Sequence, residues 1–299
     1  MNTLLALLVV GAMGVEEGPT TLTVQEDGQP VLVYHRAPNP ELPAPRRMVR
    51  AGYVHPLYGL DGDVLTQDLP LDHLHHRGMY FAWPEAAYGA RDFDIWHLEG
   101  VRPRVESATH RTAGESVVLA FDHRWSFDTR PEQEIVDERV TVVVHPAEGD
   151  TRAIDVTGVF TNKGERPFRL LGADDKGYGG FNIRPDARRK PLTFHAASGV
   201  IEEDVLELDS PWAAVTSTND EGVQSGVAVF QHPENPDYPH DGWILRHYGF
   251  LGASWPHLEP YVLEPGESVT LRYRVLVYRG DAARAGVAQA HAAYVSASE

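Results

Sequence analysis

Histidines are concentrated in one short stretch of the chain. Of the 15 histidines, five lie between Tyr53 and His97, among carboxylates, arginines and aromatic residues. These five are His55, His73, His75, His76 and His97. Imidazole titrates near neutral pH and is also the most common metal-binding side chain. The stretch therefore predicts a polar functional site that either moves protons or holds a metal ion.

Proton transfer is the first interpretation of this stretch. One or two imidazoles next to a carboxylate are sufficient for acid/base chemistry. The predicted catalytic residues here are His55, His75, His76 and Asp72. The neighbouring His73, Arg77 and His97 are predicted to contact the substrate, because their side chains can orient a hydroxyl or a carboxylate.

Two other interpretations stay open. Pro70 and Gly78 bracket the histidines, so a long helix is not expected between them. If the segment is extended, His73 and His75 share one face and could chelate a divalent metal, with His55 or His97 completing the set. No cofactor is predicted otherwise. In the third interpretation, the rings only form hydrogen bonds with the backbone of a loop.

Aromatic and polar residues elsewhere extend the predicted binding site. An exposed aromatic face suits the C–H face of a sugar ring, and a glycine-rich segment at 176–182 permits close approach of backbone and ligand. Its glycine spacing does not match a phosphate-binding loop. The predicted substrate contacts are Tyr58, His73, Arg77, Trp83, Trp96, His97, Lys176, Tyr178, Asn182, Arg246 and Tyr248.

Strand-like runs dominate the rest of the chain. Glu134–His145 and Ser268–Tyr278 alternate between apolar and polar residues, which is typical of half-buried strands. Met48–Val54 and Ile244–Phe250 are also expected to be strands. Only Asp281–Val295 is helix-like, with Asp281 as the expected N-cap. Roughly fifteen strands without alternating helices predict one all-β domain over residues 15–299, built as a large antiparallel sandwich.

Composition excludes several classes of partner and chemistry. The net charge is −17, so the chain repels nucleic-acid phosphates and anionic membrane surfaces. The absence of cysteine excludes disulfides and thiolate nucleophiles. There is no Gly-x-Ser-x-Gly elbow, so serine hydrolase chemistry has no visible support. A small polar molecule is the expected partner.

Several motifs together resemble the PmoA-like proteins over roughly residues 30–280. They read HPLYGLDGDVLTQDLPLDHLHHRG from His55, FDIWH from Phe93, KGYGGFNIR from Lys176, GVAVFQHPENP from Gly226 and LRYRVLVYRGD from Leu271. This resemblance implies a β-protein of uncharacterised activity.

A second stretch, HLEPYVLEPGESVTLRYRV from His257, is similar to part of the galactose-mutarotase-like proteins. That resemblance implies a large antiparallel sandwich that binds sugar in a cleft, with Glu259 as the catalytic base. The sequence thus predicts a protein that acts on or binds carbohydrate, by epimerase, lyase or hydrolase chemistry or as a sugar-binding module without catalysis.

The N-terminus predicts export. Leu4–Met13 is an apolar run that is too short to span a bilayer, and no other run approaches the ~20 residues of a membrane helix. Ala12 and Gly14 are small residues at the −3 and −1 positions of a cleavage site. Residues 1–14 are therefore expected to be a signal peptide, and the mature protein is expected to be periplasmic or secreted.

Export has a direct test. We expect N-terminal sequencing of protein recovered from the native host to begin near Val15, because cleavage follows the small residue at −1. Recovery of the protein from the cytosol with Met1 intact would contradict export.

Overall fold

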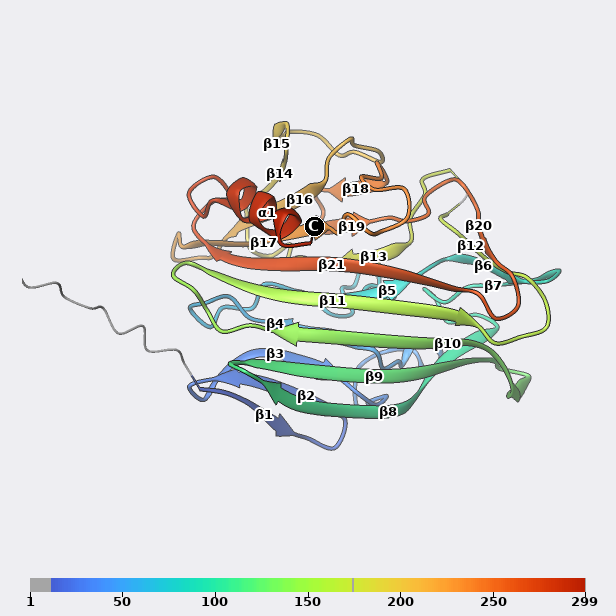
Figure 1. The fold of residues 1–299 in the computed structure, drawn as a ribbon. Helices are drawn as coiled ribbons and strands as arrows, with labels where there is room; N and C mark the ends of the chain where they lie inside the picture. Colours follow the sequence, from blue (N-terminus) through green and yellow to red (C-terminus); the bar gives the residue numbers. More distant parts are fainter. Residues whose placement is uncertain (1–11, 174, 299) are drawn as a thin grey trace, which may run out of the picture.

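A computed structural model describes residues 12–173 and 175–298 of the chain. It shows two large antiparallel sheets, one small sheet and a C-terminal helix (Figure 1). The predicted all-β sandwich with a short C-terminal helix is therefore confirmed. Most of the predicted signal peptide lies outside the described residues. No helix in the described part of the chain is long and apolar enough to cross a membrane.

The eight-stranded sheet carries the histidine-rich stretch. Its strand order is β1-β2-β3-β4-β5-β13-β19-β18. The strands are β1 Met13–Glu17, β2 Thr21–Glu26, β3 Gln29–His35, β4 Tyr53–Leu57, β5 Met79–Ala82, β13 Gly180–Ile183, β19 Phe250–Ala253 and β18 Trp243–Arg246. A short 3₁₀ helix, η1 Arg46–Met48, lies in the connection between β3 and β4.

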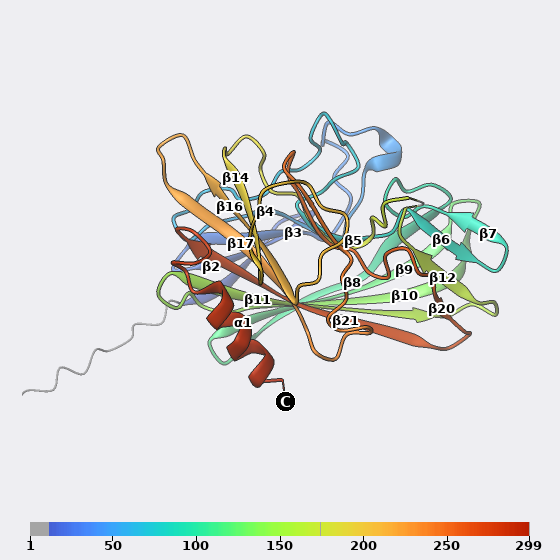
Figure 2. The same cartoon turned by 90° about the horizontal axis from the view of Figure 1, so that it is seen from above.

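The nine-stranded sheet forms the other layer. Its order is β15-β14-β16-β17-β21-β11-β10-β9-β8. The strands are β15 Gly199–Ile201, β14 Leu192–Ala196, β16 Trp212–Thr218, β17 Gln224–Gln231, β21 Ser268–Arg279, β11 Thr151–Asn162, β10 Arg130–Val144, β9 Ser116–Phe127 and β8 Val101–Ala113. A four-stranded sheet lies at one end of the sandwich (Figure 2). It contains β20 Tyr261–Leu263, β12 Phe168–Leu171, β6 Glu85–Tyr88 and β7 Arg91–Phe93.

One apolar core fills the space between the two large sheets. Phe81 of β5 and Phe160 of β11 meet with ring centroids 5.4 Å apart, and Tyr34 of β3 stacks on Phe121 of β9 at 3.5 Å. The alternation predicted for Ser268–Tyr278 produces this packing, because its apolar residues are buried while the residues between them face outward. The packed core thus holds the two large sheets together and supports the loops on their outer faces.

Three sequence predictions need correction. Met48 belongs to η1, and the strand predicted from it begins only at Tyr53. Ile244–Phe250 is not one strand but a hairpin of β18 and β19, which turns at Gly249 with φ +105°. The helix α1 spans Val287–Ser296 and its N-cap is Gly286. Asp281 instead accepts a hydrogen bond from the backbone of Arg284, in a turn that precedes the helix.

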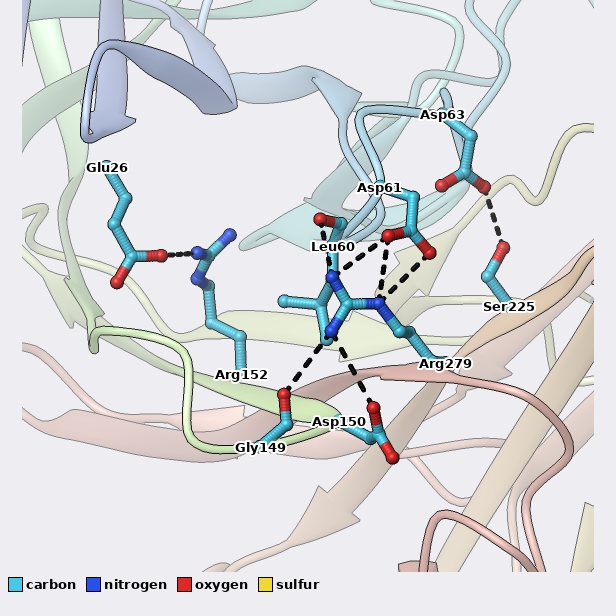
Figure 3. A network of polar contacts seen from close by, with 9 residues as sticks. All are labelled: Glu26, Leu60, Asp61, Asp63, Gly149, Asp150, Arg152, Ser225 and Arg279. Carbon is cyan, nitrogen blue, oxygen red and sulfur yellow. Dashed lines mark hydrogen bonds and ion pairs between the residues drawn. The ribbon is translucent and has the colours of Figure 1, made fainter. Parts of the chain in front are cut away.

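A polar network ties the two large sheets together at one end (Figure 3). Arg279 of β21 donates to Asp61 at 2.9 Å and 3.0 Å and to the carbonyl oxygen of Leu60 at 3.1 Å. In the same network, Asp63 accepts a hydrogen bond from the Ser225 hydroxyl at 2.7 Å. The loop after β4 is thereby anchored to the opposite sheet.

The core predicts a large effect for one substitution. Phe160 is fully buried against Trp83 and Trp125, so Phe160→Ala should lower the free energy of unfolding by about 3–5 kcal/mol in urea titration. Val262→Ala is the control, since Val262 is 46% exposed and its loss should cost less than about 0.5 kcal/mol. Equal stability of the two variants would contradict a core at Phe160.

Candidate functional site

The candidate site lies on the outer face of the eight-stranded sheet. Tyr80 of β5 pairs with Asn182 of β13, which also pairs with Gly252 of β19. Their strand neighbours Phe81 and Phe181 belong to the core, so Tyr80 and Asn182 point away from it. Loops cover this outer face and bury a second apolar cluster that includes Trp96 and Phe250.

The histidine segment crosses this face as two consecutive turns. The amide of His73 donates to the carbonyl oxygen of Pro70, and the amide of His76 donates to that of His73, both at 2.9 Å. The extended conformation considered for this segment is therefore not adopted. Because of the turns, His73 and His76 do not point to opposite sides; their rings stack with centroids 4.6 Å apart.

Four of the five predicted histidines meet in one cluster. His75 lies 4.6 Å from His76 and 4.2 Å from His97, measured between ring centroids. With His73, these residues form what we term the imidazole cluster. His55 is not in contact with it: its Nδ1 lies 3.0 Å from the Thr66 hydroxyl, and its carbonyl oxygen lies 2.8 Å from the His35 ring.

Aromatic rings surround the imidazole cluster. Tyr248 stacks on His73 at 4.8 Å, and Trp96 lies 5.6 Å from His76. Tyr178 contacts Trp96 at 6.1 Å and is half-buried, as is Tyr248. Three predicted substrate contacts therefore do lie beside the histidines, and two of them keep part of their ring in solvent.

A buried arginine fixes the cluster to the sheet. Arg184, whose side chain is 2% exposed, donates to both oxygens of Asp72 at 3.1 Å and 3.0 Å. Its other terminal nitrogen lies 3.3 Å from Nδ1 of His76, and its guanidinium lies over the Tyr248 ring. Sequence reasoning missed Arg184. Its signal was the alternation in the Gly180–Arg184 segment, which places Arg184 on the same face as Asn182.

His97 differs from the other rings because a carboxylate orients it. Nδ1 of His97 lies 2.7 Å from one Asp94 oxygen, while the other Asp94 oxygen accepts the backbone amides of Trp96 and His97. This hydrogen bond raises the pKa of the His97 imidazole above its ordinary value of 6.5. His97 is half-exposed, so it combines a positioned ring with access to solvent.

Burial has the opposite effect on the two inner rings. It lowers the pKa of His75 to about 3, assisted by the nearby His97 and His73. Burial also places the pKa of His76 far below its usual value, with His75 and the Arg184 guanidinium adding to the effect. Both rings are therefore neutral at physiological pH and suited to hydrogen bonding rather than to carrying a proton. For Asp72, burial opposes ionisation, but hydrogen bonds from His73 and Arg184 outweigh it and lower the pKa of the carboxyl.

Several predicted residues lie away from solvent. Arg77 is fully buried, where it pairs with Asp68 at 3.1 Å and hydrogen-bonds the carbonyl oxygen of Met48. Trp83 is in the core, and its indole nitrogen donates to the carbonyl oxygen of Trp255 at 2.7 Å. In this conformation neither side chain is open to a substrate.

Other predicted residues lie on different loops. Tyr58 forms a bridge with Val64, in the loop anchored by Arg279. Lys176 is exposed in the loop that precedes Tyr178. Glu259 is exposed between β19 and β20 and forms no hydrogen bond or ion pair with any described residue. Arg246 lies at the rim of the site, pairs with Asp204 at 3.0 Å and lies over the Tyr248 ring.

The ring geometry does not form a metal site. Within residues 12–173 and 175–298, no three His, Asp or Glu side chains are arranged to hold a metal ion. Beneath the rings, however, the buried atoms Trp96 Nε1 and Asn182 Oδ1 lack a hydrogen-bond partner among the described residues.

The chain belongs to DUF6807, a family of unknown function, whose model matches residues 21–292. No curated protein matches the sequence significantly.

Among solved structures, a putative aldose 1-epimerase from Klebsiella pneumoniae subsp. pneumoniae is 9% identical, with 94% of this chain and 86% of that chain covered and a TM-score of 0.48. A GH36 alpha-galactosidase from Geobacillus stearothermophilus is 11% identical, with 90% and 40% covered and a TM-score of 0.38. A heparan sulfate lyase from Pedobacter heparinus is 10% identical, with 94% and 37% covered and a TM-score of 0.42.

The chain thus spans well under half the length of the galactosidase and the lyase. At TM-scores this low, the likenesses assign no activity or residue role to this chain. The functional argument therefore depends on its own side chains.

The two kinds of imidazole can be distinguished by NMR titration of protein carrying ¹³C-labelled histidine. His97 should titrate above 6.5 and His75 near 3. Because the folded-state pKa of His97 is raised, its contribution to stability is complete below its ordinary pKa and is lost as pH rises through the folded value. Asp94→Asn should lower the pKa of His97 by removing the charged partner.

Asp92→Asn is the matched control for this titration, since Asp92 is two residues away and its side chain is 82% exposed. It should leave the His97 midpoint unchanged. If Asp94→Asn changes the His97 midpoint no more than Asp92→Asn does, the Asp94 carboxylate does not control the pKa of His97.

Proposed function

We propose that this member of the DUF6807 family binds a carbohydrate on the outer face of its eight-stranded sheet and uses His97, held by Asp94, to transfer a proton. The observation that carries the proposal is the His97–Asp94 dyad, which lies 4.2 Å from a second, neutral imidazole at the edge of an aromatic cluster. A carboxylate-oriented histidine with solvent access is an arrangement that supports general acid/base catalysis.

The surroundings of the dyad favour a sugar as the ligand. Hydroxyl groups that leave water must find new hydrogen bonds, and neutral imidazoles and tyrosine hydroxyls provide donors and acceptors in the same place. Tyr178 adds a half-exposed aromatic ring, whose face suits the C–H groups of a pyranose, while the half-exposed Tyr248 already stacks on His73. A polyhydroxylated ring is the small molecule that uses both properties together.

The roles within the cluster follow from its electrostatics. His97 is the proton-transfer group, because the Asp94 carboxylate raises its pKa above 6.5 and its ring reaches solvent. His75 is half-buried, stays neutral and positions a hydroxyl group, whereas His76 is buried and lies against Arg184. Arg184 and Asp72 keep the histidine segment in place. Epimerisation, elimination and hydrolysis of a sugar all need such a transfer.

Two alternative functions are a sugar-binding module without catalysis and a metal-dependent enzyme. A sugar-binding module without catalysis would use the aromatic rings but would not need the Asp94 carboxylate. A metal-dependent lyase or isomerase would need the histidines to rearrange around a divalent ion, and it would lose its metal and activity together on treatment with a chelator. The predicted export and the PmoA-like resemblance stay proposals alongside these, based on the N-terminal sequence and the motifs.

Replacement of His97 tests the proposal. We expect His97→Gln to reduce turnover of an oligosaccharide substrate by about 10²–10⁴-fold, because a positioned acid or base is lost. Affinity for the sugar and the melting temperature should change little. His110→Gln is the control, since His110 is an exposed histidine of β8, in the nine-stranded sheet, that pairs with Glu17 at 3.0 Å.

The readouts are product formation followed by NMR and binding followed by calorimetry, across a panel of neutral and acidic oligosaccharides. Binding without turnover in wild type and His97→Gln alike would support the sugar-binding module. Loss of turnover on chelation would support the metal-dependent enzyme. If no sugar binds, or if His97→Gln retains full turnover, the proposed function is wrong.

A further inference from the structure

A cleft lies at the edge of the sandwich and is lined in part by Leu98, the residue that follows His97 in the chain. It has a volume of about 400 Å³ and lies between the connection after β3 and the start of the edge strand β8. Four arginines line it: Arg36, Arg50, Arg102 and Arg104. The other described residues that line it are apolar, and there is no Asp or Glu among them. The chain as a whole has a net charge of −17, so the cleft is a positively charged region on an acidic protein.

Two of the four arginines have carboxylate partners outside the cleft. Arg36 donates to Glu17 at 2.8 Å, and Arg102 donates to Asp128 at 3.0 Å. Arg104 is exposed and forms no ion pair with any described residue. At least one full positive charge at the cleft is therefore not neutralised by the protein.

Arg50 is the unusual member of the four. It is 7% exposed, its terminal nitrogens reach the carbonyl oxygens of Ile95 and Phe81, both at 3.4 Å, and its guanidinium lies over the Tyr80 ring. Its Nε has no hydrogen-bond partner among the described residues. A buried cation that lacks a directly paired acid is energetically costly.

Glu138 is the carboxylate that influences Arg50 electrostatically, but it forms its hydrogen bonds with other residues. Glu138 accepts a hydrogen bond from the indole nitrogen of Trp125 at 2.7 Å, and its carboxylate lies 3.2 Å from Nδ1 of His123. It influences Arg50 through space but does not bond to its guanidinium. The donors of Arg50 are thus only weakly satisfied by the protein itself.

We propose that this cleft is a binding site for an oxyanion carried by a small molecule, such as a sulfate ester or the carboxylate of an acidic sugar. Guanidinium groups match the geometry of both anions and bind them through charge-assisted hydrogen bonds. The volume suits a ligand of about one or two sugar rings. The apolar remainder of the lining contacts the uncharged part of the ligand. This site is separate from the imidazole cluster and does not require the proposed proton transfer.

The test uses sodium sulfate and sodium glucuronate as probes, at constant ionic strength, with glucose as the uncharged comparison. Binding is followed by calorimetry and by the rise in melting temperature that a native-state ligand produces. We expect at least one of the two anions to bind, and glucose not to bind here. Sulfate alone identifies a sulfate ester site, and glucuronate alone identifies a carboxylate site.

Substitutions locate the binding. Arg104→Gln should weaken it by about tenfold, the effect of losing one charge-assisted hydrogen bond. Arg111→Gln is the matched control, because Arg111 is exposed on the same strand β8 but does not line the cleft. Arg50→Gln should abolish binding if it folds; if it does not fold, the Arg104 and Arg111 variants decide.

The outcome is independent of the proposed carbohydrate chemistry. The Arg104→Gln and Arg111→Gln variants leave the imidazole cluster intact, so failure at one site does not affect the conclusion about the other. The proposal is overturned if neither anion binds, or if Arg104→Gln and Arg111→Gln weaken binding equally. The second result would mean that only the overall charge of the protein matters.

Discussion

The burial of one guanidinium on the outside of a sheet determines the arrangement of the candidate site. Arg184 projects from the end of β13, and solvent reaches almost none of its side chain. An arginine in such a place must be paired, and Asp72 pairs with it through both carboxylate oxygens. Because Asp72 belongs to the histidine segment, the same ion pair holds that segment against the sheet. The turns at His73 and His76 and the ring contacts that follow from them depend on this anchor.

The pair is not a simple buried salt bridge. Its guanidinium is buried, but about half of the Asp72 side chain remains in solvent, so water screens part of the attraction. The main contribution of the ion pair is to fix the position of the histidine segment, which determines which imidazoles are buried. His76 lies against Arg184 and is neutral, whereas His97 lies at the rim, beside its own carboxylate. Residues of one type thereby acquire different protonation behaviour within a few ångströms.

Local sequence patterns predicted the strands well where alternation was regular. Ser268–Tyr278 and Glu134–His145 each became part of a long strand, because one face had to enter the core. The same patterns could not locate the turn at Gly249 or the late start of α1. Both depend on backbone conformations, at Gly249 and Gly286, that apolar spacing does not encode.

The grouping of histidines was visible in the sequence, but their partners were not. Arg184 is 112 residues from Asp72, and nothing in either segment alone indicates the pairing. Arg77 is next to the histidines in sequence and was expected to line the site, yet its side chain is directed into the protein, toward Asp68. His55, at the end of a predicted strand, contacts Thr66 instead of the cluster. Sequence proximity identified the region, and tertiary packing decided which side chains face a ligand.

The central claim is that a sugar binds at the imidazole cluster on the outer face of the eight-stranded sheet. A crystal structure of the protein with an oligosaccharide selected by binding measurements tests it most directly. The account predicts a sugar ring against Tyr178 or Tyr248, with a hydroxyl or ring atom within hydrogen-bonding distance of Nε2 of His97. A sugar bound elsewhere on the surface, with His97 and the aromatic rings uncovered, would contradict it.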